Sequence, residues 1–263
     1  MTRLDAAFAR LKATTDAGLV TYITAGDPDL ERTAGLLRAL PGAGADVLEV
    51  GVPFSDPLAD GPVIQRASER ALRAGTTLRK VIAMIARERD RIDAPVVIFT
   101  YANPIERLGY DTFVAAAADA GVDGVLVLDL PIDEAGPLAR KLEERGLAPI
   151  FLVSPTTPPE RVRRAAKIGS GFLYAISRLG VTGARDALSS DAAGVVATIR
   201  RVSELPVALG FGISRPEHVR AACAIADAAV VGSAIVNVIA ESGDDEDPVA
   251  RVCRHVRWLK GVA

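Results

Sequence analysis

The sequence predicts an α/β protein that folds as a (β/α)8 barrel, the TIM-barrel fold, with an extra N-terminal helix and long loops after strands 2 and 6. Eight short apolar runs alternate with longer segments of helical periodicity. The runs are almost continuously apolar, which is typical of parallel strands covered on both faces. A length of 263 residues suits one barrel domain spanning residues 1–263. A doubly wound open sheet is the rival architecture that these patterns leave open.

The chain begins with an amphipathic segment, MTRLDAAFARLKA, in which Leu4, Phe8 and Leu11 recur at helical spacing between charged residues. It has no apolar core ahead of a cleavage site, so we expect a helix of the mature protein rather than a secretion signal. No stretch approaches the roughly 18 to 20 apolar residues needed to cross a bilayer. We therefore expect a cytoplasmic protein that does not enter a membrane.

The strands and helices follow in regular alternation. We expect helices to begin at Asp111, as a cap, and at an S-x-x-E capping box from Ser214 to Glu217, and two others to end at Gly121 and Gly146. The predicted strands begin, in chain order, at Leu19 (LVTYIT), Asp46 (DVLEV), Pro95 (PVVIFTY), Gly124 (GVLVL), Ala148 (APIFLV), Phe172 (FLYAIS), Pro206 (PVALGFG) and Asp227 (DAAVVGS).

Composition limits the partners. The formal net charge is −2 and no Lys/Arg-rich run is present, so nucleic acid is not an expected partner. The two cysteines, Cys223 and Cys253, lie in helix-like apolar patterns and are read as buried free thiols.

Two long loops follow predicted strands, at residues 51–62 and about 177–190, where barrels place their chemistry. Glu49 lies one residue before the end of DVLEV, so we expect burial to raise its pKa and make it a proton carrier near neutral pH. Asp60 lies in the first loop. The alternatives are a Glu49 paired with an Arg of another strand, and an Asp60 that merely caps the helix starting near Pro62.

Two glycine-bordered turns predict a phosphate site. GFGIS (210–214) follows the seventh strand, and VGSAIV (231–236) follows the eighth, with Ser233 placed to begin a short helix. Backbone amides of such turns and a helix N-terminus bind anions, and barrels commonly place phosphate there. Gly183, in SRLGVTG, could bring the loop after strand 6 onto the same anion.

Other chemistries are disfavoured by where the residues fall. The histidines, His218 and His255, lie on separate predicted helices, so we expect no metal site. All five lysines lie away from the C-terminal ends of the predicted strands, which disfavours a Schiff-base aldolase: Lys12, Lys80, Lys141, Lys167 and Lys260. The groups that remain for cleaving a carbon–carbon bond are carboxylates, a tyrosine and a phosphate-binding site.

The chain closely resembles the family of tryptophan synthase α subunits. The signature-like segment LEVGVPFSDPLADGPVIQ carries the resemblance, together with TAGDPD, TYANPI, LDLPIDE, SRLGVTGAR, GFGIS and VGSAIV. The resemblance implies a retro-aldol cleavage of indole-3-glycerol phosphate to indole and glyceraldehyde 3-phosphate.

The same resemblance assigns residues to roles. Glu49 would protonate indole C3 and help deprotonate the glycerol hydroxyl, Asp60 would bind the ring N–H, and Tyr174 would contact the glycerol chain. Arg178 and Thr182 would act in closure of the loop after strand 6. Phosphate would be held by Gly183, Gly212, Gly232 and Ser233. The indole pocket would be lined by Tyr22, Phe99, Tyr101, Leu126, Leu128, Leu152 and Phe211.

The resemblance also implies a partner, a tryptophan synthase β subunit, in an α2β2 heterotetramer that passes indole between subunits. Asp56, Pro57 and the Leu128–Pro131 turn, with Pro131 at its end, would lie at that contact. No cofactor is expected on this chain, because the pyridoxal phosphate would belong to the β subunit. The alternatives are a stand-alone lyase, a phosphosugar isomerase or epimerase of the same fold, and a non-catalytic activator of a partner.

Overall fold

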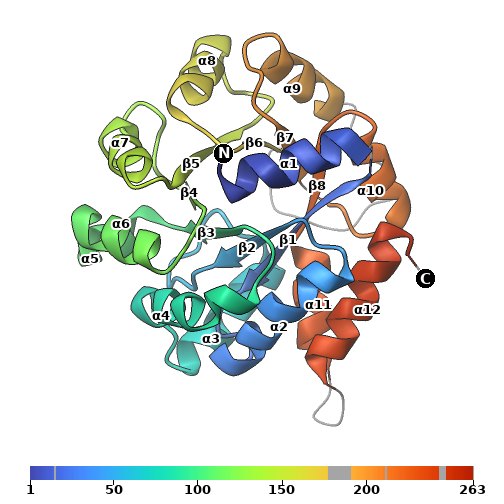
Figure 1. Ribbon diagram of the computed structural model, residues 1–263. Coiled ribbons are helices and arrows are strands. Elements are labelled where there is room, and N and C mark those ends of the chain that lie inside the picture. The colour runs from blue at the N-terminus through green and yellow to red at the C-terminus, as the bar shows by residue number, and fades with distance from the viewer. Residues whose placement is uncertain (15, 177–190, 211, 243–246, 263) are drawn as a thin grey trace.

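The computed structural model describes residues 1–14, 16–176, 191–210, 212–242 and 247–262. Its strands form a closed barrel in which each strand pairs in parallel with the next and β8 pairs with β1 (Figure 1). Closure confirms the predicted barrel and excludes the open sheet. The strands are β1 (Gly18–Thr24), β2 (Val47–Gly51), β3 (Val96–Thr100), β4 (Gly124–Val127), β5 (Ala148–Val153), β6 (Leu173–Ile176), β7 (Val207–Gly210) and β8 (Ala228–Val231).

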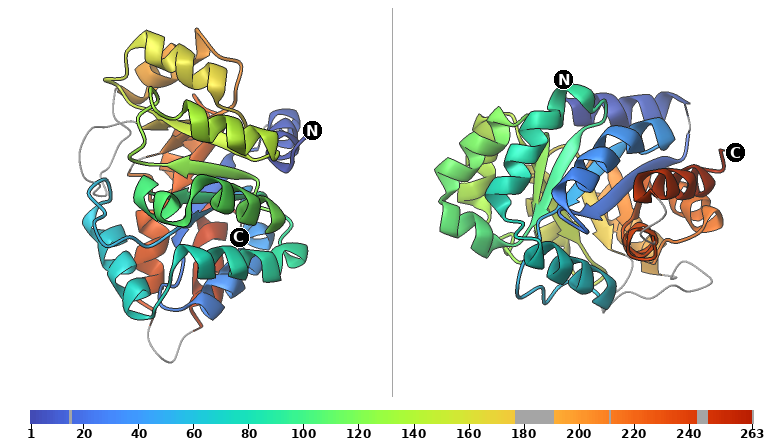
Figure 2. Two further views of the ribbon diagram at one scale, coloured as in Figure 1. Left: turned by 90° about the vertical axis from the view of Figure 1, so that its left-hand side faces the viewer. Right: turned by 90° about the horizontal axis from the view of Figure 1, so that it is seen from below.

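Helices surround the barrel, as the turned views in Figure 2 also show. Gly121 and Gly146 follow α6 and α7 with φ of 73° and 74°, which confirms both predicted ends. The helices are α1 (Arg3–Thr14), α2 (Leu30–Ala43), α3 (Pro62–Arg73), α4 (Leu78–Glu88), α5 (Ala102–Leu108), α6 (Tyr110–Asp119), α7 (Gly136–Glu144), α8 (Pro159–Ile168), α9 (Asp191–Arg200), α10 (Pro216–Cys223), α11 (Ser233–Ala240) and α12 (Pro248–Lys260), with a 3-10 turn at Arg89–Arg91. Over the described part of the chain, no helix is long and apolar enough to cross a membrane.

The extra N-terminal helix closes one end of the barrel. Leu4, Phe8 and Leu11 of α1 are buried and belong to the same apolar cluster as the inward side chains of the strands. The Phe8 ring lies 5.4 Å from that of Phe172. In Figure 1, α1 lies across the barrel inside the ring of other helices. This end carries the strand N-termini, so α1 seals the face opposite the predicted site.

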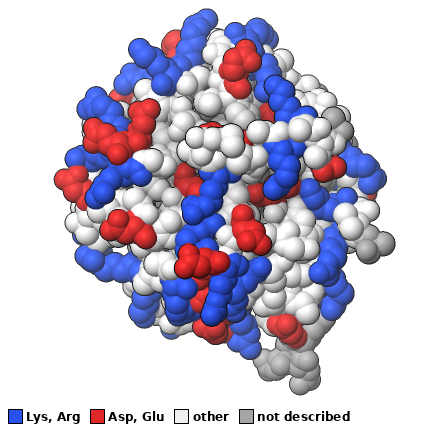
Figure 3. All heavy atoms as spheres, viewed as in Figure 1, with Lys and Arg blue, Asp and Glu red and all other residues white. Residues whose placement is uncertain are grey.

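Three aspartates stabilise the sealed end. Asp46, Asp123 and Asp227 each precede a strand and accept a hydrogen bond from a backbone N–H of the strand before it. The donors are Leu19 N at 2.9 Å, Val96 N at 2.8 Å and Val207 N at 2.7 Å, respectively. Arginines or a lysine neutralise these carboxylates: Arg10 and Lys260 on Asp46, Arg3 on Asp123, and Arg200 on Asp227. In Figure 3, which views this face, acidic side chains lie among Lys and Arg.

Two predicted helix starts are wrong. The N-cap of α6 is Gly109, and Asp111 lies inside the first turn, where it pairs with Lys141. The N-cap of α10 is Arg215, with no side-chain cap, so Ser214 lies one residue too early for a capping box. In each case a neighbouring backbone restriction sets the start. Gly109 has φ of 87° between two helices, and the proline after Arg215 takes the first helical position.

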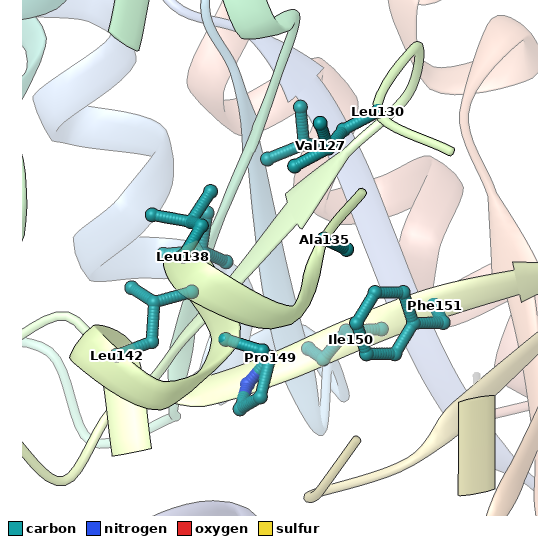
Figure 4. Close-up of a pocket in the computed structure, with 10 residues that line it drawn as sticks. Val127, Leu130, Ala135, Leu138, Leu142, Pro149, Ile150 and Phe151 are labelled. Atoms are coloured by element: carbon teal, nitrogen blue, oxygen red, sulfur yellow. The ribbon is translucent and has the colours of Figure 1, made fainter. Parts of the chain in front are cut away.

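A small apolar cavity of about 20 Å³ lies between α7 and strands β4 and β5 (Figure 4). Val127, Leu130, Leu138, Leu142 and Phe151 are among its lining side chains. A cavity without polar partners does not hold an ordered water. It is therefore a packing defect beside the barrel and is separate from the site described below.

That residues 1–263 form a single domain stays a prediction. One cooperative transition in calorimetry would support it, and two resolved transitions would contradict it.

Candidate active site

Alternation along the strands places a glutamate between two tyrosines inside the barrel. Tyr22 of β1 pairs in register with Glu49 of β2. A Cβ added to Gly51 would lie 2.1 Å from the Tyr22 hydroxyl, and one added to Gly210 would lie 2.4 Å from the Tyr174 hydroxyl. Each tyrosine therefore fills the space that a glycine on the next strand leaves open. Burial and the nearby charge of Glu49 both raise the pKa of Tyr174.

Glu49 is a deeply buried carboxyl group. It is 1% exposed, and its Oε1 atom has no hydrogen-bond partner in the described structure. Burial raises its pKa to about 8, as expected for a carboxyl group removed from water. Among the described residues no ion pair involves Glu49, so the alternative of a structural Arg–Glu pair is wrong. At neutral pH the group holds its proton.

Asp60 is a second buried carboxyl with a different environment. Its Oδ2 atom accepts a hydrogen bond of 3.0 Å from the Tyr101 hydroxyl. Burial raises its pKa to about 6, and the Tyr101 hydrogen bond opposes that rise. The N-cap of α3 is Gly61, and no side-chain hydrogen bond caps this helix. The helix-cap alternative for Asp60 is therefore wrong.

The loop that carries Asp60 is tied to its surroundings by contacts that the sequence did not reveal. The Gln65 side chain donates 2.8 Å to the carbonyl oxygen of Asp60. One turn further along α3, Arg70 forms two 2.7 Å hydrogen bonds with Asp27, which is 1% exposed in the loop after β1. Asp27 belongs to the TAGDPD segment that carries part of the family resemblance, but Arg70 lies 43 positions away along the chain. The pairing appears only once the chain has folded.

Most of the residues predicted to line the indole pocket lie in or on the inner apolar cluster. The Tyr22 and Phe99 rings meet edge to face at 5.1 Å. Leu126 is fully buried, whereas Leu128 and Leu152 are partly buried and pack against the cluster. Tyr101 differs from the expectation of an apolar wall, because its hydroxyl is bonded to Asp60. Phe211 lies outside the described residues.

The predicted phosphate-binding residues flank the same end of the barrel. Gly232 is the N-cap residue of α11 and Ser233 its first residue. A Cβ on Gly232 would be 3.4 Å from Tyr22 Cβ, so the helix N-terminus adjoins the Glu49 side of the site. Gly212 has φ of 74°, a left-handed conformation that favours glycine. Arg178, Thr182 and Gly183 lie outside the described residues.

The residues predicted for a partner contact lie on the loops after β2 and β4. Asp56 is exposed, and Leu58 beside it is 83% exposed. Pro131 is exposed, while Pro57 is half-buried. Two arginines of α8, Arg161 and Arg164, hold the β4 loop through Asp133 at 2.9 and 3.1 Å.

The lysines lie on helices α1, α4, α7, α8 and α12, as the sequence indicated. Within the described ranges, no group of three or more His, Cys, Asp or Glu is placed to hold a metal ion. At neutral pH, Glu49 can donate a proton and Asp60 can supply a negative charge, because burial raises the pKa of the first to about 8 and that of the second only to about 6.

Known proteins resemble this chain along nearly its whole length. It is 49% identical over 262 residues to the tryptophan synthase alpha chain of Burkholderia thailandensis, covering 99% of this chain and 96% of that protein. It is 50% identical over 239 residues to that of Caulobacter sp. strain K31, covering 90% and 86%. The structure of Mycobacterium tuberculosis tryptophan synthase matches with a TM-score of 0.91 and 36% identity, over 99% of this chain and 98% of that chain.

A mutant tryptophan synthase alpha-subunit from the hyperthermophile Pyrococcus furiosus matches with a TM-score of 0.86 and 37% identity, over 94% of this chain and 98% of that chain. Residues 8–261 also match the family model described as tryptophan synthase alpha chain. The chain belongs to the tryptophan synthase alpha chain family.

Proposed function

We propose that Glu49 and Asp60 divide the work of one reaction, with Glu49 as the proton carrier and Asp60 as the fixed charge. Family membership makes the protein a carbon–carbon lyase of tryptophan biosynthesis, which cleaves indole-3-glycerol phosphate to indole and glyceraldehyde 3-phosphate. It also decides against the isomerase or epimerase alternative. The observation that carries the division of labour is the pair of pKa values, about 8 for Glu49 and about 6 for Asp60.

Glu49 begins the cycle with its proton, because neutral pH lies below its pKa of about 8. It gives that proton to C3 of the indole ring, which becomes tetrahedral and leaves the ring system cationic. It then takes the proton of the hydroxyl on the adjoining glycerol carbon. A carbonyl forms there as the carbon–carbon bond breaks, and the bond's electron pair returns to the ring. Glu49 ends as it began, so the protons balance.

Asp60 stabilises the cationic ring. Neutral pH lies above its pKa of about 6, so it is ionised while Glu49 is protonated. A carboxylate that accepts the ring N–H opposes the positive charge that develops after protonation at C3. The reaction has no need of a lysine or a metal, because the indole ring itself takes up the electrons.

The remaining assignments belong to the same proposal. Tyr174, half-buried near Glu49, contacts the glycerol chain. Gly212, Gly232 and Ser233 hold the phosphate, together with Gly183, while Arg178 and Thr182 act in loop closure. The proposed indole pocket consists of Tyr22, Phe99, Tyr101, Leu126, Leu128 and Leu152, together with Phe211.

The partner of the chain is a tryptophan synthase β subunit, and the pyridoxal phosphate belongs to that subunit. We propose an α2β2 assembly in a cytoplasmic location, with the loops that carry Asp56, Pro57 and Pro131 at the contact. Exposed Leu58 and the arginine-anchored Asp133 support these two loops as a presented surface.

The decisive experiment measures indole release from indole-3-glycerol phosphate by the chain alone and with a β subunit. We expect slow release alone and a large rate increase with the partner. A fast rate that the β subunit leaves unchanged would instead support the stand-alone lyase. The activator alternative would require that Glu49→Gln with Asp60→Asn still stimulates the partner while wild type cleaves nothing.

A further inference from the structure

The hydroxyl of Tyr101 has its single proton directed at Asp60. It accepts a hydrogen bond of 3.2 Å from the backbone N–H of Ala59 and lies 3.0 Å from Asp60 Oδ2. A phenol carries one donor and can accept in addition. Because Ala59 N can only donate, the hydroxyl must accept there and use its own proton on Asp60. The direction of this hydrogen bond is therefore set by the backbone.

The ring that carries this hydroxyl is held firmly. Tyr101 is 4% exposed and directly follows β3, so the barrel positions its backbone. Its ring lies 5.0 Å from that of Phe54, which belongs to the same loop as Asp60. Gln65 holds the carbonyl of Asp60 from the other side. Side chains of two elements thus determine where the carboxylate lies.

We propose that Tyr101 is a positioning residue for Asp60: its hydroxyl occupies Oδ2 and leaves Oδ1 for the ring N–H of the substrate. This inference deepens the proposed function and rests on it. A carboxylate oriented by one strong donor presents its second oxygen in a defined direction, which favours the planar N–H of an indole.

The charged and titratable neighbours come from several elements. Tyr22 of β1 is close enough to Asp60, Glu49 and Tyr101 for their charges to act on its hydroxyl. Asp129, in the loop after β4, acts on Tyr101 in the same way. Among the described residues, Tyr101 alone donates a side-chain hydrogen bond to the Asp60 carboxylate. Burial raises the pKa of Asp60 and this hydrogen bond lowers it. Removing the hydroxyl leaves burial unopposed, so the pKa of Asp60 should rise.

The test is the pH dependence of kcat/KM for indole-3-glycerol phosphate cleavage by wild type, Tyr101→Phe and Tyr110→Phe. Tyr110 lies on α6, outside the site, and serves as the matched control. We expect the acid limb of Tyr101→Phe to move up by about one pH unit, roughly a tenfold loss at the acid end, since hydrogen bonds to charged groups are strong. The alkaline limb, which reports Glu49, should stay in place.

Two further measurements separate positioning from packing. Placing 3-fluorotyrosine at position 101 keeps the ring and strengthens the donor, so the acid limb should move to lower pH. In an Asp60→Asn background, Tyr101→Phe should cause little further loss, because its effect passes through Asp60.

Superimposable acid limbs for all three proteins, with at most a uniform drop in rate for Tyr101→Phe, would overturn the positioning role. That result, with wild type still cleaving the substrate, would leave the proposed function intact. Absence of cleavage by wild type would instead contradict the proposed function itself.

Discussion

Both ends of the barrel contain buried carboxyl groups, but the surroundings of these groups differ. At the end sealed by α1, Asp46 and Asp123 are buried, yet each is bonded to a strand N–H and to a cationic side chain. At the open end, Glu49 is also buried, and its Oε1 atom has no hydrogen-bond partner among the described residues. The contrast shows that burial alone does not decide the role of a carboxyl group. Compensation by hydrogen bonds makes it structural, and lack of compensation makes it a proton carrier.

The largest effect is expected from Glu49→Gln. The amide keeps the shape of the side chain but cannot transfer the proton, so kcat for indole formation should fall by about 10²- to 10⁴-fold. Steady-state assays of indole release would measure this fall in kcat. The matched control is Asp123→Asn at the sealed end, which should retain the kcat of wild type per folded molecule. A loss of only a few-fold in Glu49→Gln would contradict the proton-carrier role.

The same substitution should change how stability depends on pH. The pKa of Glu49 is raised by folding from 4.5 to about 8, so the folded state binds this proton more tightly than the unfolded chain. The protonated Glu49 therefore contributes fully to the free energy of unfolding below about pH 4.5, and this contribution is lost as the pH rises through about 8. The slope within that window is roughly 1.4 kcal/mol per pH unit.

Urea unfolding of wild type and Glu49→Gln at pH 5, 6.5 and 8 would test this. Relative to wild type, the variant should gain several kcal/mol in free energy of unfolding by pH 8, since about 1.4 kcal/mol accrues per unit. If the difference in free energy of unfolding between the two proteins stays the same at all three pH values, the fold does not hold Glu49 protonated.

At the sealed end, Asp123→Asn should lower the free energy of unfolding by about 2 kcal/mol, because Arg3, Arg89 and Val96 N lose the charge they face. Arg89 matters most, since its side chain is 10% exposed and its Nη1 atom has no hydrogen-bond partner in the described structure. Chemical denaturation would measure the loss. An unchanged stability would mean that the carboxylate charge does not contribute at this end.

The smallest effect is expected at the apolar cavity beside the barrel. Val127→Ile adds one methylene to a space of about 20 Å³, which should raise the free energy of unfolding by at most about 0.8 kcal/mol. Activity should not change, because the cavity lies between the strands and α7, outside the inner cluster of side chains that surrounds Glu49. Val262→Ile, which adds the same methylene at an exposed position after α12, is the matched control. A drop in stability for Val127→Ile would indicate that the site cannot accommodate the added group.

The sequence alone predicted much of the fold and part of the candidate site. The eight apolar runs, the amphipathic start and the strand-end position of Glu49 predicted the barrel, its extra N-terminal helix and a raised pKa of Glu49. These features depend on spacing within a single element, which a sequence displays directly. The wrong helix starts at Asp111 and Ser214 came from capping residues considered without the glycine and proline beside them.

Only the tertiary structure determined which donors and cations lie next to each buried carboxyl group. Tyr101 and Asp60 lie 41 positions apart, and Arg70 and Asp27 lie 43 apart, so no local pattern relates the partners. The sequence indicated that Glu49 and Asp60 are acids near one end of a barrel. Folding determined that Tyr101 donates a hydrogen bond to Asp60, whereas no group in the described part of the chain donates one to Glu49 Oε1. The physical reason is that proton affinity depends on the surroundings that distant strands and loops assemble around a carboxyl group.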